Sequence, residues 1–339
     1  MSFKKIINFI KILTSYLLSR ITQKIIHWGR PVSISIEPTN LCNLHCLECP
    51  SGTRLLSRER GLIETDTFRK IIDQLSPDLH WLTFYFQGEP YLHSQFHEMV
   101  SYAKSKNIYV STSTNGHFLN EINAISTVKA GIDRLIISLD GTDQESYSAY
   151  RKGGSYEKVV QGITEIVNRK KSLNSGKPYI VIQFLVLKTN QHQISKIRQL
   201  GLDLGVNKVE LKTAQFYEFA KGNPLMTDID RYSRYKRCIS GSDNTPLYKI
   251  KNRLPNRCFR MWSSSVITWD GWVVSCCYDK DAGYKMGNLN DQSFNEIWTG
   301  QKYHDFRQKI LHSRKEIDIC KNCSEGLGYF SFKSAMKSV

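Results

Sequence analysis

A regular alternation of β-like and helix-like runs, beginning at Val32, is the feature that most constrains the fold. Amphipathic stretches such as Tyr156–Lys171 separate short runs of β-forming residues. Strands and helices that alternate in this way form a parallel sheet with crossover helices. Six βα units are fewer than the eight of a closed barrel, so we expect an α/β fold that stays open. The predicted strands are Val32–Glu37, Leu82–Gln87, Ile108–Thr114, Arg134–Leu139, Tyr179–Phe184 and Lys208–Lys212.

Three cysteines follow the first predicted strand. Cys42, Cys46 and Cys49 have C-x3-C-x2-C spacing, and the motif Gly88-Glu89-Pro90 follows the second strand. An iron–sulfur cubane normally has one thiolate for each iron, so three cysteines leave one iron open to a ligand that is not protein. A zinc knuckle with His45 as the fourth ligand is the alternative. It is disfavoured because His45 lies between two of the cysteines, where one short turn would have to direct every side chain at one metal.

Together, the cysteine spacing and the second motif resemble the radical S-adenosylmethionine (radical SAM) enzymes over roughly residues 31–215. The resemblance implies an open (β/α)6 partial TIM barrel with a [4Fe–4S] cluster on Cys42, Cys46 and Cys49. It also implies exchangeable S-adenosylmethionine on the open iron and a reductant such as flavodoxin or ferredoxin. In this family an electron from the cluster cleaves the cofactor to a 5′-deoxyadenosyl radical, which removes a hydrogen atom from the substrate.

Polar motifs at the strand ends form the expected cofactor site, because the βα loops of barrel-like folds converge on one mouth. By resemblance, Glu89 pairs with the cofactor's ammonium, with Gly88 and Pro90 as backbone neighbours. Gln87 stands where the family has a further glycine, and Glu48 stands where many members have an aromatic residue that stacks on adenine.

The resemblance also assigns polar residues at the ends of the third and fourth strands and beyond. Asn115-Gly116 is otherwise an ordinary turn sequence, and Asp140-Gly141 an ordinary lead-in to a helix. The residues assigned are Asn115 beside the cofactor, Ser138 and Asp140 at its ribose, and Arg151 at its methionine carboxylate.

The later cysteines form a second pattern that resembles the twitch domain, a short relative of the SPASM domain, and implies one auxiliary [4Fe–4S] cluster. Four thiolates suffice for such a cluster, although alone they would equally fit a zinc ribbon. Ser324–Tyr329 lacks the further cysteines of a full SPASM domain. Cys277 competes with Cys276 as a ligand, and Cys238 is interpreted as a structural thiol. The predicted ligands are Cys258, Cys276, Cys320 and Cys323.

The chain therefore divides into four predicted parts. A hairpin turning at Asp270-Gly271 would present Cys276, and a helix over Asp291–Gln308 would return the chain to Cys320. The parts are a basic amphipathic helix (1–30), the radical SAM partial barrel (31–215), a linker with some helix (216–254) and a small α+β iron–sulfur domain (255–339).

The first thirty residues contain no Asp or Glu, and apolar residues recur in them at helical spacing. Charge interrupts this segment too often for it to span a bilayer, and Lys11 with the missing cleavage site argues against a signal peptide. Two alternatives stay open for this helix. One is peripheral contact with an anionic membrane, which its cations and isoleucines favour, and the other is packing across the open side of the barrel. The apolar stripe is Ile6, Ile10, Leu13, Leu17, Ile21 and Ile25.

Charge and cysteine content bound the location and the partners. Nine cysteines without a convincing export signal predict a reducing, cytoplasmic location. The formal net charge of +16 is compatible with an anionic partner, and nine basic residues lie between Arg231 and Arg260, where a solvated linker explains them equally well. Nucleic acid is disfavoured as a partner, because Glu89 and the strand-end motifs have no use in such a protein.

The sequence predicts an enzyme that abstracts a hydrogen atom from its substrate. Oxidation or another modification of a polar small molecule, such as a sugar or cyclitol, competes with modification of a peptide or protein side chain. The missing second auxiliary cluster favours the small molecule, as do the few residues ahead of Pro31, which leave no room for a peptide-recognition domain. A net oxidation needs a base, for which Lys212, Gln215 and Arg151 are weak candidates. A non-catalytic iron–sulfur electron carrier or metal-binding protein is the alternative of another class.

Overall fold

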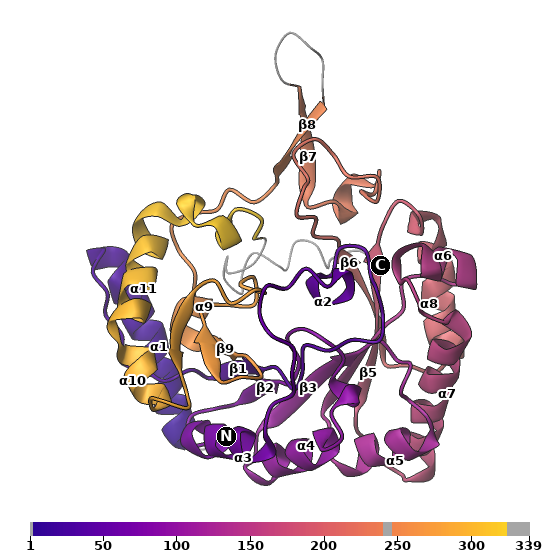
Figure 1. Cartoon of the computed structure of the whole chain (residues 1–339), viewed down its shortest axis with the longest axis horizontal. Coiled ribbons are helices and arrows are strands. Elements are labelled where there is room, and N and C mark those ends of the chain that lie inside the picture. The colour runs from indigo at the N-terminus through magenta and orange to yellow at the C-terminus, as the bar shows by residue number, and fades with distance from the viewer. Residues whose placement is uncertain (1–2, 240–245, 324–339) are drawn as a thin grey trace.

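One sheet of nine strands organises the chain, of which the computed structural model describes residues 3–239 and 246–323. The strand order is β11-β10-β9-β1-β2-β3-β4-β5-β6, so β11 and β6 are its edges within the described residues. From β1 to β6 each strand pairs parallel with the next (Figure 1). The predicted open α/β partial barrel is confirmed. The strands are β1 Ser33–Ile36, β2 Trp81–Thr83, β3 Tyr109–Thr114, β4 Arg134–Ser138, β5 Tyr179–Val186, β6 Lys208–Thr213, β9 Ser264–Ile267, β10 Trp272–Val274 and β11 Lys285–Asn288.

Crossover helices cover the outer face of the curved sheet (Figure 1). Helix α7 shows why they form: Ser155 caps its first turn, and Val159, Ile163 and Ile166 are buried on one face. Each such side chain contributes about 1.5–3 kcal/mol by leaving water. The helices are α1 Phe3–Thr22, α2 Pro50–Thr53, α3 Thr65–Leu75, α4 Phe96–Ser105, α5 Glu121–Lys129, α6 Gln144–Tyr150, α7 Tyr156–Ser172, α8 Ile194–Asp203, α9 Arg260–Ser263, α10 Phe294–Thr299 and α11 Gln301–Ser313, with short 3-10 turns at Pro90–Leu92, Gln191–Gln193, Asp230–Tyr232, Arg314–Glu316 and Asp318–Cys320.

Two predicted elements have different bounds. Strand β2 ends well before the predicted Gln87, because the chain leaves the sheet there to pack against the cysteine loop, where Gly88 N donates to Ser51 Oγ at 3.2 Å. The single helix predicted over Asp291–Gln308 is two helices, α10 and α11, that meet at the extended residue Gly300.

The C-terminal region continues the barrel's sheet. Strand β9 pairs parallel with β1, in the register Ser33↔Ser264, and β10 returns antiparallel to β9. The predicted turn at Asp270-Gly271 is confirmed, with Gly271 at φ 84°. The predicted α+β region therefore shields the β1 edge of the barrel, which would otherwise present unpaired backbone groups. Its last predicted residues, 324–339, lie outside the described part of the chain.

The predicted linker contains a β-hairpin that projects from the body (Figure 1). Its strands, β7 (Tyr235–Ile239) and β8 (Pro246–Ile250), pair antiparallel, with Arg237 opposite Tyr248. The expectation of an irregular linker with some helix was therefore wrong for this segment. The basic residues in both strands conceal the short apolar alternation on which a strand prediction depends.

Helix α1 packs on the body, but not through its apolar stripe and not across the open side of the barrel. Lys5 Nζ donates to Leu79 O just before β2, at 2.6 Å, and the ring of Tyr16 contacts those of Phe259 and Trp262 edge-on. The helix thus lies along the amino ends of β9, β1 and β2. No helix in the described residues is long and apolar enough to cross a membrane. The face of α1 that packs consists of Asn8, Ile12, Ser15, Tyr16 and Ser19.

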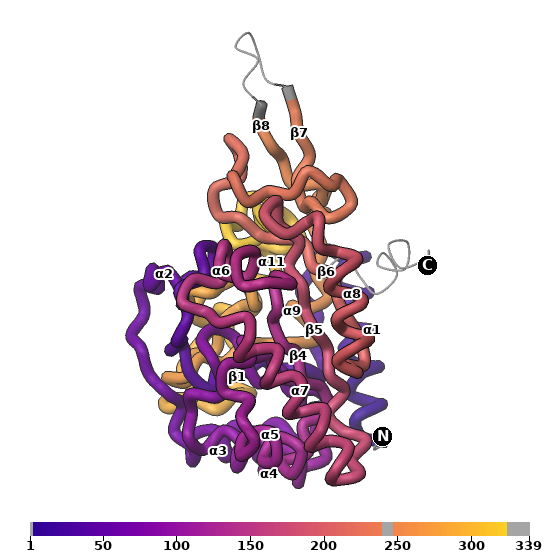
Figure 2. The backbone as a smooth tube through the Cα atoms, turned by 90° about the vertical axis from the view of Figure 1, so that its right-hand side faces the viewer, coloured from indigo at the N-terminus to yellow at the C-terminus, as the bar shows by residue number. Residues whose placement is uncertain are grey.

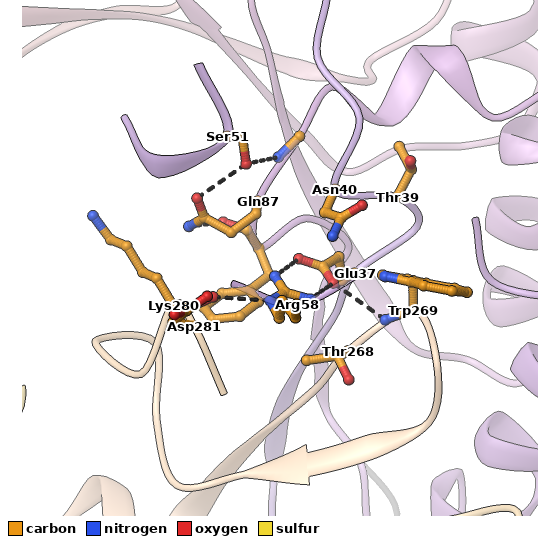
Figure 3. A network of polar contacts seen from close by, with 12 residues as sticks. Glu37, Thr39, Asn40, Ser51, Arg58, Gln87, Thr268, Trp269, Lys280 and Asp281 are labelled. Atoms are coloured by element: carbon orange, nitrogen blue, oxygen red, sulfur yellow. Dashed lines mark hydrogen bonds and ion pairs between the residues drawn. The ribbon is translucent and has the colours of Figure 1, made fainter. Parts of the chain in front are cut away.

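A buried ion pair joins the barrel to the C-terminal region (Figure 3). Arg58 donates from both terminal nitrogens to the two carboxylate oxygens of Glu37, each at 2.6 Å. The side chain of Glu37 is fully buried and that of Arg58 is 6% exposed. Arg58 Nε also donates to Lys280 O, and Trp269 N donates to Glu37 Oε2. The ion pair therefore fixes the end of β1 and the segment after the cysteines to two C-terminal loops, one through Glu37 and the other through Arg58.

We predict that Arg58→Met lowers the free energy of unfolding by about 3–5 kcal/mol, because it leaves the buried Glu37 charge without a partner. Adding Glu37→Gln to this variant should restore part of the loss. The measurement is urea unfolding of the anaerobic, iron-loaded protein.

The matched control is Arg69→Met, which removes an arginine from a solvent-exposed pair with Glu98 and should cost at most about 1 kcal/mol. Equal losses in the two single variants would contradict the special role of the Glu37–Arg58 pair.

Candidate functional site

The three cysteines after β1 line one pocket at the carboxyl ends of the strands, where the barrel rule expects it. The pocket has a cavity volume of about 450 Å³ and opens to solvent. Cys46 O accepts a hydrogen bond from Cys49 N at 3.2 Å, and the loop is tied to the segment after β4 where His45 N donates to Lys152 O. A side chain at Gly52 would lie 2.6 Å from Cys46 N, so this glycine lets the short helix α2 pack beneath the cysteines.

The Gly88-Glu89 segment fits tightly against the cysteine loop. Glu89 N donates to Leu41 O at 2.7 Å. Gly88 has φ 75°, and a Cβ there would lie 2.4 Å from Thr39 O. No other residue fits this position without moving the backbone. The sequence motif therefore sets the distance between Glu89 and the cysteines.

The carboxyl group of Glu89 is buried in the pocket wall and has a raised pKa. Its Oε1 accepts from Thr114 Oγ1 at 2.8 Å and from Tyr91 N, and its Oε2 accepts from Asn115 N at 2.7 Å. Burial raises its pKa to about 7, although these three donors lower it. No ion pair to Glu89 occurs within the described residues. A buried carboxylate that lacks a cation of its own is suited to receive a ligand's ammonium.

Arg151 forms an ion pair with Asp140, the residue predicted to bind the cofactor's ribose. Its Nε donates to Asp140 Oδ2 at 2.6 Å, and its Nη1 lies 3.9 Å from Cys46 Sγ. Asp140 Oδ1 meanwhile accepts from Leu185 N. Asp140 is thus occupied within the chain and orients the guanidinium beside the cysteines.

Most of the predicted cofactor residues come together, and two do not. Gly88, Glu89, Asn115, Ser138 and Arg151 all line the pocket. Asp140 and Pro90 do not line it, which argues against direct ligand contact. The two carboxylate oxygens of Asp140 already accept hydrogen bonds from Arg151 and Leu185. Pro90 is buried as the first residue of a 3-10 turn.

Sequence reasoning missed two cations that line the same pocket, Arg234 and Lys280. Arg234 precedes β7, and its Nε donates to Thr213 Oγ1 at 2.9 Å. Lys280 extends from a C-terminal loop (Figure 3), and its Nζ lies 5.3 Å from the centroid of the Tyr217 ring. Burial lowers the pKa of Lys280. The sequence signal for Lys280 was its position four residues after Cys276, and Arg234 belongs to the basic run between Arg231 and Arg260.

The second set of cysteines surrounds a separate small cavity. Its four predicted ligands and Cys277 all line it. Arg314 lies against this group, with Nη2 3.5 Å from Cys323 Sγ. The five cysteines come from the segment before α9, the loop after β10 and the C-terminal 3-10 turns. The topology therefore gathers ligands that are more than sixty residues apart in the chain. They are Cys258, Cys276, Cys277, Cys320 and Cys323.

The cysteines fit the clusters by their chemistry. The nine cysteines form no disulfide within the described residues, and each of the two sets lines a cavity. Burial raises the pKa of Cys42 to about 11 and that of Cys320 to about 12. Iron binding must therefore displace protons from these thiols, which makes cluster assembly depend on pH. Within the described residues, no three His, Cys, Asp or Glu side chains are placed to hold a single metal ion.

Comparisons with known proteins agree with this geometry. A family model of the radical SAM superfamily matches residues 36–192, and a model of the SPASM iron–sulfur cluster-binding domain matches residues 258–324. The tungsten-containing aldehyde ferredoxin oxidoreductase cofactor-modifying protein of Pyrococcus furiosus is 28% identical over 317 residues, covering 85% of this chain and 86% of that protein. The PqqA peptide cyclase of Gluconobacter oxydans is 26% identical over 283 residues, covering 79% and 76%. The crystal structure of BtrN in complex with AdoMet and 2-DOIA is 19% identical, with a TM-score of 0.53, covering 88% of this chain and 94% of that one.

We predict that the reconstituted protein holds about eight irons in two cubanes. Replacing Cys42, Cys46 and Cys49 by Ala should remove half of the iron, and Cys320→Ala with Cys323→Ala should remove the other half. The measurement is iron and acid-labile sulfide per chain, with Cys238→Ala as the control that keeps both clusters. Bound zinc without labile sulfide would contradict both assignments.

We predict that Glu89→Gln keeps its iron but binds S-adenosylmethionine roughly tenfold to a hundredfold more weakly, since a charge-assisted hydrogen bond contributes about 1.5–3 kcal/mol. In the wild type, affinity should fall as the pH drops below the Glu89 pKa of about 7, because the protonated carboxyl cannot pair with an ammonium. The variant should lack this dependence.

Equilibrium dialysis with radiolabelled cofactor measures both effects. Glu218→Gln is the control, because Glu218 is exposed and lies outside the pocket wall, so its loss should leave the affinity unchanged. Equal affinities of the wild type and Glu89→Gln at all pH values would remove Glu89 from the cofactor site.

Proposed function

The chain belongs to the radical SAM superfamily and carries a C-terminal SPASM-type region, and from this premise we propose that it oxidises a polar small molecule, such as a sugar or cyclitol, that bears an anionic group. It is an enzyme that uses a [4Fe–4S] cluster, S-adenosylmethionine and auxiliary iron–sulfur chemistry. The bound cofactors supply abstraction of a hydrogen atom from carbon and an acceptor for the remaining electron. The substrate class is the part that we propose.

One observation carries the choice of substrate: three cations lie on the pocket wall contributed by β6 and the segments after it. They are Lys212 at the end of β6, Arg234 before β7 and Lys280 after the auxiliary cysteine loop. Arg234 is fixed by hydrogen bonds to Thr213 and Tyr278, and Lys212 Nζ lies 3.6 Å from Glu210 Oε1. Cations that converge on a cavity in this way favour a carboxylate or phosphate ligand.

These three basic residues of the pocket wall have different roles in the proposed reaction. Arg234 and Lys212 would bind the anionic group and fix the substrate's orientation toward the cysteine loop, which orders the reacting carbon. Lys280, in its neutral form, would accept the proton that an alcohol loses on oxidation, because burial lowers its pKa and so favours that form. Of the three candidates from the sequence, Lys212 is assigned here to the anionic group. Lys280 fits the role of base better than the other two, Gln215 and Arg151.

Modification of a peptide side chain is the second candidate, since one relative is named as a peptide cyclase and the pocket is open to solvent. The residues ahead of the barrel do not favour it. They form α1, which lies on the side of the molecule opposite the cysteine-loop helix α2 (Figure 2), where they cannot present a peptide to the pocket.

We predict that sugar or cyclitol phosphates, or sugar acids, increase the release of 5′-deoxyadenosine above the uncoupled background, whereas their neutral parents and peptides do not. The assay uses the reconstituted enzyme with S-adenosylmethionine and a chemical reductant. A substrate deuterated at the reacting carbon should transfer deuterium to 5′-deoxyadenosine. Stimulation by peptides alone would overturn the proposed substrate class.

With a stimulating substrate in hand, Arg234→Gln should raise KM roughly tenfold or more and leave the uncoupled background unchanged. Lys280→Met should instead lower kcat and leave hydrogen abstraction detectable. Arg237→Gln is the matched control, because Arg237 lies on β7 outside the pocket wall and is exposed. An equal effect of Arg234→Gln and Arg237→Gln would contradict an anion site in the pocket.

A further inference from the structure

Helix α1 turns its apolar residues outward. A surface helix of a soluble domain normally buries its apolar stripe and exposes its polar face. Here Ser15 and Ser19 are fully buried, whereas Ile10 is 54% exposed, Leu17 is 44% exposed and Ile21 is 78% exposed. The buried serines find partners locally, since Ser19 Oγ donates to Ser15 O at 2.7 Å. The helix is therefore docked by its more polar face.

The outward stripe is long and continuous. At helical spacing its members follow one another along the full length of α1, with Thr14 as the single polar residue among them. Isolated exposed apolar residues need no explanation, but a contiguous patch of this kind marks an interaction surface. This outward stripe adds Phe3 and Ile7 to the predicted one and lacks Ile25, which lies beyond the helix. It consists of Phe3, Ile6, Ile7, Ile10, Leu13, Leu17 and Ile21, each at least 37% exposed.

The orientation of α1 is fixed, so the stripe cannot turn inward. Asn8 Nδ2 donates to Arg30 O and Asn8 Oδ1 accepts from Arg30 N, which pins the first half of the helix to the segment before β1. Trp262 Nε1 donates to Ile26 O at 3.0 Å, just beyond the helix, and Ile26 N donates to Ser19 Oγ at 2.9 Å, which pins the second half of α1. A Cβ at Gly29 would lie 2.4 Å from Ile12 Cγ1, so the returning chain passes directly beneath the helix.

The basic residues beside the outward stripe of α1 indicate what binds to it. Lys4 and Lys11 flank the stripe on one side and Arg20 flanks it on the other, and the first thirty residues contain no acidic side chain. An apolar face bordered by cations lies at the interface of a bilayer, with its apolar residues at the level of the acyl chains and its cations at the lipid phosphates. We infer that α1 binds the enzyme peripherally to an anionic membrane. A second copy of the chain would bring the same cations together and is disfavoured for that reason.

This inference does not depend on the proposed reaction. Lys5 Nζ donates to Leu79 O and the Asn8 contacts lie just before β1, so α1 sits at the amino ends of the strands, whereas the pocket lies at their carboxyl ends. Figure 2 places α1 and the cysteine-loop helix α2 on opposite sides of the molecule. Membrane binding through the stripe would leave the pocket free.

The test is flotation of the full-length, iron-loaded protein with vesicles of phosphatidylcholine alone or mixed with phosphatidylglycerol. We expect binding to the mixed vesicles that weakens as salt screens the cations. Ile10→Gln with Leu17→Gln should reduce the partition coefficient on the order of tenfold or more, because each side chain loses its transfer from water to the interface. Lys4→Gln with Lys11→Gln should reduce the preference for phosphatidylglycerol.

Matched controls separate the stripe from general surface effects. Ile122 and Leu202 are 74% and 73% exposed on other helices, so Ile122→Gln with Leu202→Gln should leave binding unchanged. Lys129→Gln with Lys171→Gln removes equal charge elsewhere and should also leave it unchanged. Unchanged iron content and circular dichroism would show that each variant folds.

Three results would overturn the inference. One is the absence of wild-type binding to either vesicle. Another is an equal loss of binding in the stripe variants and their controls. The third is a dimer in sedimentation velocity that the Ile10→Gln and Leu17→Gln changes dissociate, which would assign the stripe to a second copy of the chain.

Discussion

The buried pair between Glu37 and Arg58 is the constraint on which the rest of the site depends. Removing two charges from water costs several kcal/mol for each ion, and only bidentate geometry with further hydrogen bonds offsets that cost. Arg58 meets this condition by also donating to Lys280 O, and Glu37 by also accepting from Trp269 N. The pair thereby holds the loop that follows the radical SAM cysteines against the SPASM-type region. Lys280 reaches the pocket because this junction is rigid.

Glu89 differs from this pair, because burial of its carboxylate destabilises the fold and a cationic ligand can reverse part of that loss. Its carboxyl has a pKa of about 7 instead of 4.5. Because folding raises the pKa of this carboxyl, the folded state binds the proton more tightly than the unfolded chain does. The free energy of unfolding therefore falls as the pH rises from 4.5 to 7, and the stabilisation from this proton is lost above pH 7. A shift of this size corresponds to about 3 kcal/mol at neutral pH. A cationic ligand beside Glu89 would recover part of that free energy, so the site is less stable empty than filled.

The sequence predicted the parts of the structure that local patterns encode. Periodicity identified all six barrel strands, and cysteine spacing identified both thiol sets, because each pattern is short in sequence. The early end of β2 depends on contact with the cysteine loop, and the pocket role of Arg234 and Lys280 depends on how β7 and the C-terminal loops fold back. Such contacts leave no periodic signal. For α1 the helix and most of its apolar stripe were predicted, but Ile25 lies beyond the helix and packs against the core. Which face of α1 packs depends on the surface that the helix meets.

The parallel sheet determines where the two proposed binding surfaces, the α1 stripe and the substrate pocket, lie relative to each other. All six barrel strands point the same way, so their amino ends and carboxyl ends lie on opposite sides of the molecule. Helix α1 occupies the first side through Lys5 and Asn8, and the cations Lys212, Arg234 and Lys280 line the pocket on the second. A substrate embedded in the bilayer that holds α1 would have no direct path to the pocket. Peripheral attachment and a polar, anionic substrate that enters from water are therefore mutually consistent, and a lipid-embedded substrate fits neither surface.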